Sequence, residues 1–290
     1  MKPHLVWLAA ALLSGCAAAT PPKAAPPTPQ TTALPADLLR LAGMAIERGA
    51  YDEARQRYER LLDVQPDNKE VLLGLAEALL GGGKAAEAKP IFAELAKDDA
   101  WRGKALVGLG LCALALRDYG DAEAPLRQAL EADPNQWRAW NGLGWLADSR
   151  QQWDQAATAY GKALALSQAS PAVDNNLGYS LLLQGRFDAA IPHFVTALNR
   201  APHLEAAQNN LRLALASVGR YDDAKANTGP GKLPMVLNNL GYVAMTRGDL
   251  GKAESLLTQA AESSPNYYDV AWRNLDQLKA LRTPPAPEAR

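Results

Sequence analysis

Paired asparagines recur three times inside apolar stretches of this 290-residue chain. They are Asn175-Asn176, Asn209-Asn210 and Asn238-Asn239, and a leucine follows each pair. Asparagine is unfavourable inside a helix, by up to about 0.7 kcal/mol relative to alanine, because its side chain competes for backbone hydrogen bonds. An amide group can donate and accept hydrogen bonds at the same time. A row of amides therefore suits the binding of a peptide backbone better than bond-breaking chemistry.

Residue patterns typical of enzymes are not found in the sequence. The histidines His4, His193 and His203 accompany no carboxylate cluster at metal-ligand spacing. There is no H-E-x-x-H, paired C-x-x-C or G-x-S-x-G pattern, and no Gly-Lys dipeptide is followed by Ser or Thr as a phosphate-binding loop requires. The glycines at 142 and 144 fall within a helical pattern rather than after a strand, which excludes a dinucleotide site. We predict no enzyme, no metal, no cofactor and no small-molecule substrate.

The composition indicates an all-helical protein. Hydrophobic residues make up 48% of the chain, with many Ala and Leu and only 3 Phe, and β-branched residues are sparse. The formal net charge is −1, which argues against a nucleic-acid binder that follows phosphates.

The N-terminus has the order of a secretory signal: Lys2, then an apolar stretch at residues 5–13 that is too short to span a bilayer. The following Leu-Ser-Gly-Cys, which ends at Cys16, resembles the lipobox of bacterial lipoproteins. That resemblance implies cleavage after residues 1–15 and acylation of Cys16 with palmitate-type chains, which anchor a protein stably when several are present. The residue after Cys16 is Ala17 and not aspartate, a pattern that resembles the outer-membrane sorting signal of bacterial lipoproteins. The alternative is an ordinary secretory signal that happens to contain a cysteine.

The mature N-terminal segment, residues 16–34, is rich in Ala, Thr and Pro and cannot form a core. In a polyproline II conformation of about 3.1 Å per residue it would reach roughly 55 Å, so we expect a tether that holds the folded part away from a membrane. The second cysteine, Cys112, lies in an Ala/Leu-rich helical stretch. We expect it to be a buried, inert thiol.

From Pro35 onward the sequence repeats with a period of 34 residues, in units that start at 35, 69, 103, 137, 171 and 205. Each unit has apolar or small residues on one helical face of its first half, and most have an Ala and an aromatic or leucine in the second half. Units one, three and five also end with Pro66, Pro134 and Pro202. Trp140, Leu143 and Gly144 follow the W-x2-L-G order, so the pattern resembles the tetratricopeptide repeat. The resemblance implies an all-α solenoid of about seven helix–turn–helix units plus a capping helix.

The predicted organisation has one break in phase. Units one to six occupy residues 35–226, with a truncated second helix in the sixth, and residues 227–233 form a Gly/Pro-rich break. Unit seven follows at 234–267, with its proline at Pro265, and a capping helix at 268–282. A Pro-rich tail at 283–290 is expected to be disordered. The break either lets unit seven move relative to the others or is compensated in a rigid array.

The asparagine pairs fall at positions 5 and 6 of units five, six and seven, beside the core stripe of the first helix. In tetratricopeptide domains this stripe lines the surface that holds peptides. The alternative is that some of these amides bond neighbouring repeats and fix their stacking, and Trp145 could equally pack between helices. Arg138 alone does not form a carboxylate clamp. The resemblance implies a groove lined by Asn141, Trp145, Asn175, Asn176, Tyr179, Asn209, Asn210, Asn238, Asn239 and Tyr242.

The stretches that begin at Asn175 and at Gln208 are similar to the TadD family of outer-membrane lipoproteins of Flp (tight-adherence) pilus assembly. The similarity covers about units three to six. It implies an outer-membrane lipoprotein that faces the periplasm and binds protein partners, with pilus or secretin components as the expected ones. A type IV pilus stability lipoprotein and an adaptor for a periplasmic peptidase or cell-wall enzyme remain alternatives.

Overall fold

The computed structural model describes residues 35–263 and 268–282. The predicted signal peptide, Cys16, the tether at 16–34, Pro265 and the tail at 283–290 lie outside the described residues. Fifteen helices are present within those ranges and no strand is. The helices are α2 (Pro35–Glu47), α3 (Tyr51–Leu62), α4 (Lys69–Gly81), α5 (Ala85–Leu95), α6 (Asp99–Ala115), α7 (Tyr119–Ala132), α8 (Trp137–Ser149), α9 (Trp153–Leu166), α10 (Pro171–Leu183), α11 (Phe187–Arg200), α12 (Glu205–Ser217), α13 (Tyr221–Lys225), α14 (Leu233–Arg247), α15 (Leu250–Ser263) and α16 (Tyr268–Arg282).

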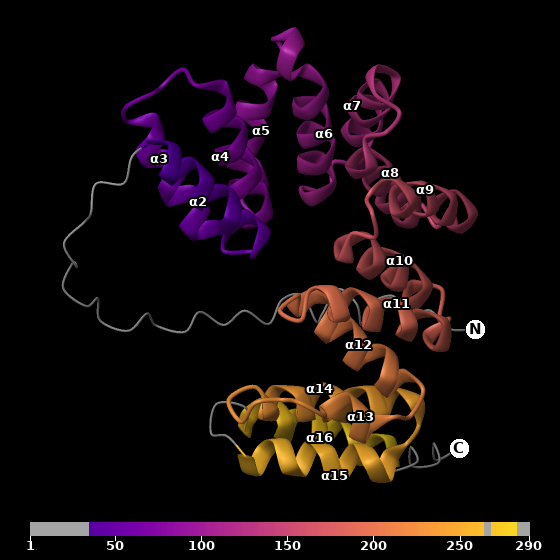
Figure 1. Cartoon of the computed structure of the whole chain (residues 1–290). Coiled ribbons are helices and arrows are strands. Elements are labelled where there is room, and N and C mark those ends of the chain that lie inside the picture. The colour runs from indigo at the N-terminus through magenta and orange to yellow at the C-terminus, as the bar shows by residue number, and fades with distance from the viewer. Residues whose placement is uncertain (1–34, 264–267, 283–290) are drawn as a thin grey trace, which may run out of the picture. The chain divides into compact units, whose positions relative to one another are not determined.

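The helices form seven antiparallel pairs followed by the single helix α16, which confirms the predicted fold class (Figure 1). We call the pairs repeats one to seven, and each has a first and a second helix. The chain divides into two compact units after Ala169. The first unit contains repeats one to four, α2 to α9, and the second contains repeats five to seven and α16. Within each unit, first helices contact the first helices of neighbouring repeats.

Helix starts follow the 34-residue period except in repeat three and, after the Gly/Pro break, in repeat seven, where α14 begins at Leu233. The first helices of repeats one, two, four, five and six begin at residues 35, 69, 137, 171 and 205. Helix α6 begins at Asp99, one turn before the expected residue 103. Repeats one, three and five place Pro66, Pro134 and Pro202 at position 32, which ends the preceding helical segment. Repeat two has Ala100 there, and the Asp98 carboxylate caps the earlier start by accepting from the Ala100 N–H.

The turn inside every repeat uses one residue with a left-handed backbone at position 15. In repeats three and four this residue is Arg117 or Gln151, with φ of 63° and 57°. The left-handed region is unfavourable for residues with a Cβ atom and is open to glycine. The five other repeats accordingly have a glycine here: Gly49, Gly83, Gly185, Gly219 and Gly248.

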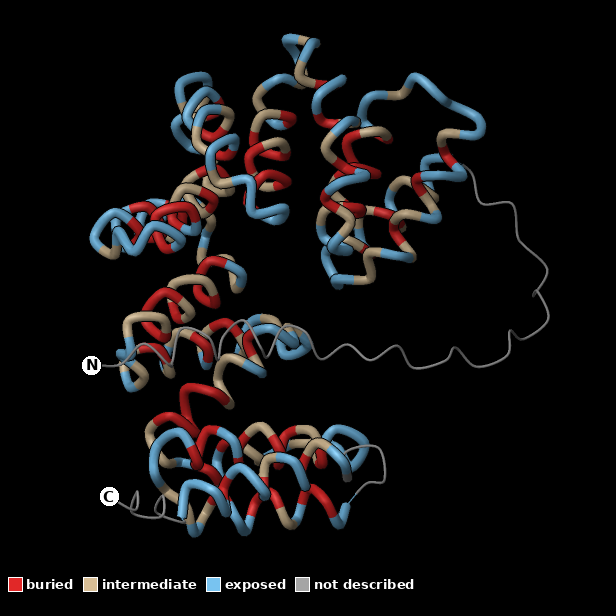
Figure 2. Tube along the Cα trace, turned by 180° about the vertical axis from the view of Figure 1, so that it is seen from behind, coloured by how far each residue is buried: buried red, intermediate tan, exposed pale blue. Residues whose placement is uncertain are grey.

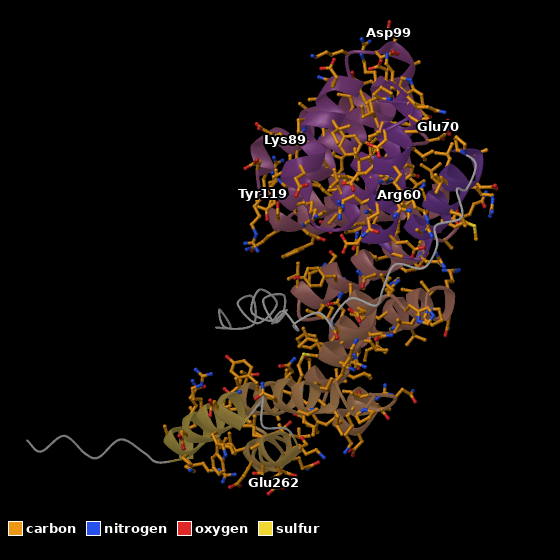
Figure 3. The ribbon with its side chains drawn as sticks, turned by 90° about the vertical axis from the view of Figure 1, so that its left-hand side faces the viewer. Arg60, Glu70, Lys89, Asp99, Tyr119 and Glu262 are labelled. Carbon is orange, nitrogen blue, oxygen red and sulfur yellow. The ribbon has the colours of Figure 1, made fainter. Side chains whose placement is uncertain are left out.

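The core lies between the paired helices, where buried residues face one another in Figure 2. A glycine at position 8 of the first helix permits close approach of a large residue from the second helix. A Cβ atom at Gly144 would lie 2.6 Å from the Tyr160 ring, and one at Gly178 would lie 2.8 Å from the Phe194 ring. The outer faces are polar, and the side chains of Asp99 and Glu262 project from the ribbon in Figure 3.

Repeat six has the predicted short second helix, because α13 spans only 5 residues. Contacts nevertheless join repeats six and seven across the Gly/Pro break. Arg247 of α14 donates to the Ser217 carbonyl, and the Tyr221 hydroxyl donates to Asp249. Lys232 Nζ lies 2.5 Å from Glu205 Oε1. The compact second unit therefore contains the break, and motion of repeat seven stays a prediction.

Candidate functional site

Two of the predicted groove amides lie between the first helices of successive repeats. Asn175 and Asn238, both at position 5, are only 9% and 7% exposed. Asn210 Nδ2 of the next repeat donates to Asn175 Oδ1 at 3.0 Å, and Asn274 Nδ2 of α16 donates to Asn238 Oδ1 at 2.9 Å. These contacts match the stacking alternative. Direct use of Asn175 or Asn238 by a guest peptide stays a prediction.

Asn274 was missed by the sequence reasoning. Asn274 follows Asn238 by 36 residues in the sequence, close to the repeat period, and Asn210 follows Asn175 by 35 residues. The signal was therefore present as an asparagine about one repeat further along the chain. A second contact, 3.3 Å long, runs from Asn175 Nδ2 to Asn176 Oδ1. Together these contacts form what we call the amide ladder of the second unit, which comprises Asn175, Asn176, Asn210, Asn238 and Asn274.

Repeats two and three of the first unit fill the same positions with apolar residues and glycine. Position 5 carries the buried Leu73 and Val107. Position 6 carries glycines, and a Cβ atom at Gly74 or Gly108 would lie 2.3 Å from the ring of Tyr58 or Phe92 in the preceding repeat. A side chain does not fit at position 6 of these two repeats, whereas all three repeats of the second unit have asparagine there. The two units thus stack their first helices with different chemistry.

The remaining predicted groove residues are more accessible. Trp145 is 39% exposed and Tyr242 is 37% exposed. Asn209 is exposed and accepts a hydrogen bond from Arg212 at 3.3 Å. The half-buried members of the predicted set are Asn141, Asn176, Tyr179, Asn210 and Asn239. Large, partly exposed aromatic residues on helices are typical of protein-binding surfaces.

Arg138 on the first helix of repeat four is already paired. Its Nη1 lies 2.5 Å from Glu77 Oε1 on α4. Helix α6 contacts both α4 and α8, so this ion pair links the two helices that flank α6. A guest that used the Arg138 guanidinium would have to compete with Glu77.

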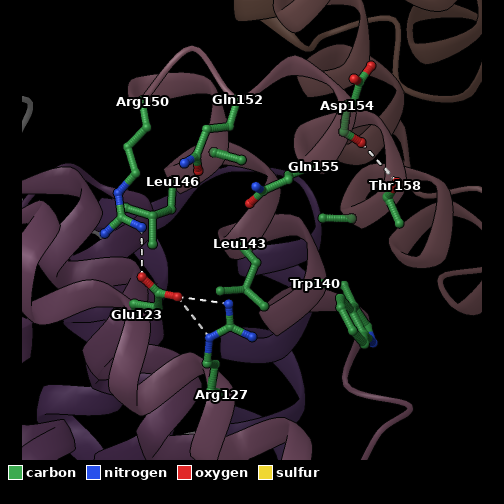
Figure 4. A pocket seen from close by; sticks show the side chains of 12 residues that line it. Glu123, Arg127, Trp140, Leu143, Leu146, Arg150, Gln152, Asp154, Gln155 and Thr158 are labelled. Carbon is green, nitrogen blue, oxygen red and sulfur yellow. Dashed lines mark hydrogen bonds and ion pairs between the residues drawn. The ribbon is translucent and has the colours of Figure 1, made fainter.

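A pocket of about 310 Å³ opens between α7, α8 and α9 of the first unit (Figure 4). Glu123 accepts hydrogen bonds from Arg150 at 2.7 Å and from Arg127 at 2.8 Å. The bonds from Arg150 and then Arg127 hold the pKa of Glu123 below its usual range, so this carboxylate is ionised at neutral pH. Leu143 and Leu146 supply an apolar wall. The sequence did not indicate this pocket because its residues come from three helices.

Trp140 lines one side of this pocket and is half-buried. Its indole Nε1 donates to the Pro134 carbonyl at 2.9 Å, and Lys162 Nζ lies 4.0 Å from the ring centroid. A cation at this distance is attracted by the ring electrons. Trp140 therefore joins the loop between repeats to the helix pair that follows.

Repeat five buries a carboxylate at the position that Trp140 occupies in repeat four. Asp174 is 3% exposed. Arg200 Nη1 donates to Asp174 Oδ2 at 2.8 Å, and His193 Nδ1 lies 3.7 Å from Asp174 Oδ1. A buried carboxylate is tolerated when a cation pairs with it. Asp174 therefore links α10 to the second helix of its own repeat.

Among residues 35–263 and 268–282, no group of three or more His, Cys, Asp and Glu side chains could hold a metal ion. Cys112 is fully buried, as predicted, and burial raises the pKa of its thiol to about 11. A thiol with so high a pKa is a poor nucleophile at neutral pH. Within the same ranges, no helix combines the length and apolar character needed to cross a bilayer.

Comparisons with known proteins agree with the repeat geometry. Tetratricopeptide-repeat profiles match residues 45–109, 107–174, 141–204 and 236–267, which together make up more than half of the chain. Among curated proteins none matches the chain in sequence.

Three solved structures share the fold. A thermophilic tetratricopeptide protein of Thermus thermophilus is 24% identical, with a TM-score of 0.53 over 66% of this chain and 98% of that one. A chain of the APC/C hetero-tetramer Cut9–Hcn1 is 17% identical, with a TM-score of 0.61 over 86% of this chain and 50% of that one. Human IFIT1, in a dimer with m7Gppp-AAAA, is also 17% identical, with a TM-score of 0.67 over 86% of this chain and 64% of that one. At these identities the likeness concerns the fold alone. The helix pairs, the 34-residue period and the matching profiles show that the chain belongs to the tetratricopeptide-repeat family.

Proposed function

We propose that this protein is an outer-membrane-anchored scaffold that binds protein partners during assembly of a Flp/Tad-type pilus or secretion machine. Proteins of the tetratricopeptide family generally mediate protein–protein interactions and are typically not enzymes. The observation that carries the proposal is the exposure of Asn209 and Tyr242 on first helices of the second unit, and of Trp145 on a first helix of the first unit.

The chemistry of this face supports a peptide guest. Each exposed amide can donate to and accept from a peptide backbone. Trp and Tyr rings bury a large area at a small cost in side-chain entropy, and such residues dominate the binding energy of many interfaces. In the second unit, the amide ladder links neighbouring first helices. A guest would then contact the outer amides and rings and leave the ladder intact.

The proposed location depends on the N-terminal residues. The Leu-Ser-Gly-Cys sequence that ends at Cys16 resembles a lipobox, and Ala17 after it resembles the signal for sorting to the outer membrane. Acylation at Cys16 would hold the protein at the membrane through its acyl chains. The predicted tether would leave the repeats accessible to periplasmic partners.

The anchor is tested with Cys16→Ser, which we expect to fold normally and to be released from membranes. Retention of this variant on membranes after a carbonate wash would argue against lipidation. Circular dichroism of the purified variant provides the control, because residue 16 precedes the first repeat and the helix content should not change.

The partner is tested by cross-linking in envelope extracts and pull-down of the full-length protein. We expect pilus or secretin components, and we expect Trp145→Ala and Tyr242→Ala to reduce their recovery. Val195→Ala is the matched control, since Val195 is 40% exposed on the second helix α11. Recovery of type IV pilus proteins, or of a periplasmic peptidase or cell-wall enzyme, would favour the corresponding alternative. Recovery that is equal for all three variants would contradict the assigned face.

A further inference from the structure

The loop between α9 and α10 differs from the other loops that connect repeats. Gln168 has φ of 49° and Ala169 has φ of 67°. Within the described ranges, no other loop between repeats contains two successive left-handed residues. Neither residue is a glycine, so both Cβ atoms disfavour this conformation. Such strained backbone persists only where the surroundings hold it, and it is typical of segments that switch between two states.

The same loop cannot receive a hydrogen bond that two of its counterparts receive. In repeat four, Trp140 Nε1 donates to the Pro134 carbonyl at 2.9 Å, and in repeat six, Gln208 Nε2 donates to the Pro202 carbonyl at 2.7 Å. Each bond ties position 4 of a first helix to the preceding loop. The residue at position 4 of repeat five is Asp174, whose side chain accepts from Arg200 and has no amide or indole N–H to donate.

The contacts of Asp174 and the sequence of the loop point in the same direction. Asp174 accepts from Arg200 at 2.8 Å, which ties the first turn of α10 to α11. Position 32 of repeat four is Gln168, where repeats one, three and five have proline. A proline would hold φ near −65° and exclude the left-handed conformation. The sequence of this loop therefore allows more than one backbone conformation at residue 168.

The two compact units of the chain are joined at this loop. The first unit ends at Ala169 and the second begins at Ser170. The Gly/Pro-rich break at 227–233, which the sequence marked as the possible hinge, is instead bridged by contacts from Arg247 to Ser217 and from Tyr221 to Asp249.

We propose that residues 168–170 are the hinge of the repeat array, and that Gln168 and Ala169 switch there between left-handed and right-handed backbone conformations. Hinges of this kind consist of a few loop residues that absorb a large change in φ and ψ. The proposal depends on the loop and its neighbours only, so it holds or fails independently of the proposed partner and location.

The experiment is a distance measurement by pulsed electron paramagnetic resonance on the full-length protein. Spin labels are attached through a non-natural azido amino acid, so that Cys16 and Cys112 remain unchanged. Four exposed helical sites are used in pairs: Ala86 with Ala157 inside the first unit, Asn199 with Glu262 inside the second, and Ala86 with Asn199 across the loop. The pair in the second unit spans the Gly/Pro break and is the matched control.

We expect the distance distribution of the Ala86–Asn199 pair to be about twice as broad as those of the two control pairs, or to have two maxima. Gln168→Pro should collapse this distribution to one population, because it removes the left-handed state. Gln168→Gly combined with Ala169→Gly should broaden it, and this second variant decides the matter if the proline variant does not fold. A wild-type distribution as narrow as the controls would overturn the proposal. The same holds if Asn199–Glu262 is the broadest pair, or if neither substitution changes the distribution.

Discussion

Replacement of Gln151 by glycine should stabilise the first unit. Gln151 is exposed and lies at the left-handed position of its turn, with φ of 57°. Five of the seven repeats have glycine at this position. The backbone N–H of Gln151 donates to the Asp148 carbonyl at 2.9 Å, and glycine would keep this bond. The substitution therefore changes the backbone preference and little else.

The magnitude follows from two opposing terms. A left-handed conformation costs a residue with a Cβ atom about 1–2 kcal/mol. Glycine loses about 0.4–1 kcal/mol more than other residues on folding, because its unfolded chain is more flexible. The difference is a net stabilisation of about 0.5–1 kcal/mol. In a unit of this size, each kcal/mol of added stability raises Tm by about 2–4 °C.

The assay is urea unfolding followed by tryptophan fluorescence. Five of the 7 tryptophans lie in helices α6 to α9 of the first unit, at 101, 137, 140, 145 and 153, so fluorescence reports mainly on its unfolding. We expect the midpoint of the Gln151→Gly protein to increase. Two control substitutions should lower stability, for reasons that also follow from backbone conformation. Gly185→Ala forces alanine into φ of 72° in repeat five, which circular dichroism should show as a loss of stability. Gln152→Gly places glycine at φ of −89°, where its flexibility only destabilises.

The result that would refute this reasoning is a Gln151→Gly midpoint equal to or below that of the Gln152→Gly protein. It would mean that the Gln151 side chain contributes more to stability than its backbone strain costs.

Individual contacts lead to three further predictions. Asn210→Ala should destabilise the second unit by about 1–2 kcal/mol in urea unfolding, because it removes the donor to the buried Asn175 carbonyl oxygen. The control Asn209→Ala, at the exposed neighbouring residue, should change stability by less than about 0.5 kcal/mol. Equal effects of the two substitutions would contradict a structural role for the ladder. Gly108→Ala should lower the free energy of unfolding by about 1–3 kcal/mol, since its Cβ atom would lie 2.3 Å from the Phe92 ring. The control Gly161→Ala, where no atom lies within 4 Å of the added Cβ, should raise it by up to about 1 kcal/mol in the same assay. The Tyr221 hydroxyl and then Arg247 lower the pKa of Asp249, so its contribution to stability is present above the unfolded value of about 3.9 and is lost as the pH falls through the lower folded value. The difference in urea midpoint between wild type and Asp249→Asn should therefore shrink on acidification, and a difference that grows would show that the sign is wrong.

The sequence determined the features that depend on local chain chemistry. The 34-residue period, the helix pairs and most helix starts follow from apolar spacing, and position 32 prolines mark where helical segments end. Five of the left-handed turn residues are glycines, because few other residues adopt that conformation at low cost. In repeat two, where Ala100 stands at position 32, the Asp98 carboxylate caps a helix that begins one turn early.

The tertiary structure decided which neighbour each side chain meets. The sequence placed the asparagines beside the core stripe, but only the packing of successive first helices shows that Asn175 and Asn238 pair with Asn210 and Asn274. The division of the chain after Ala169 was likewise not visible in composition, since residues 227–233 carry the stronger Gly/Pro signal. The asparagine contacts join residues about one repeat apart, and the preference of a single residue does not specify its partner at that separation.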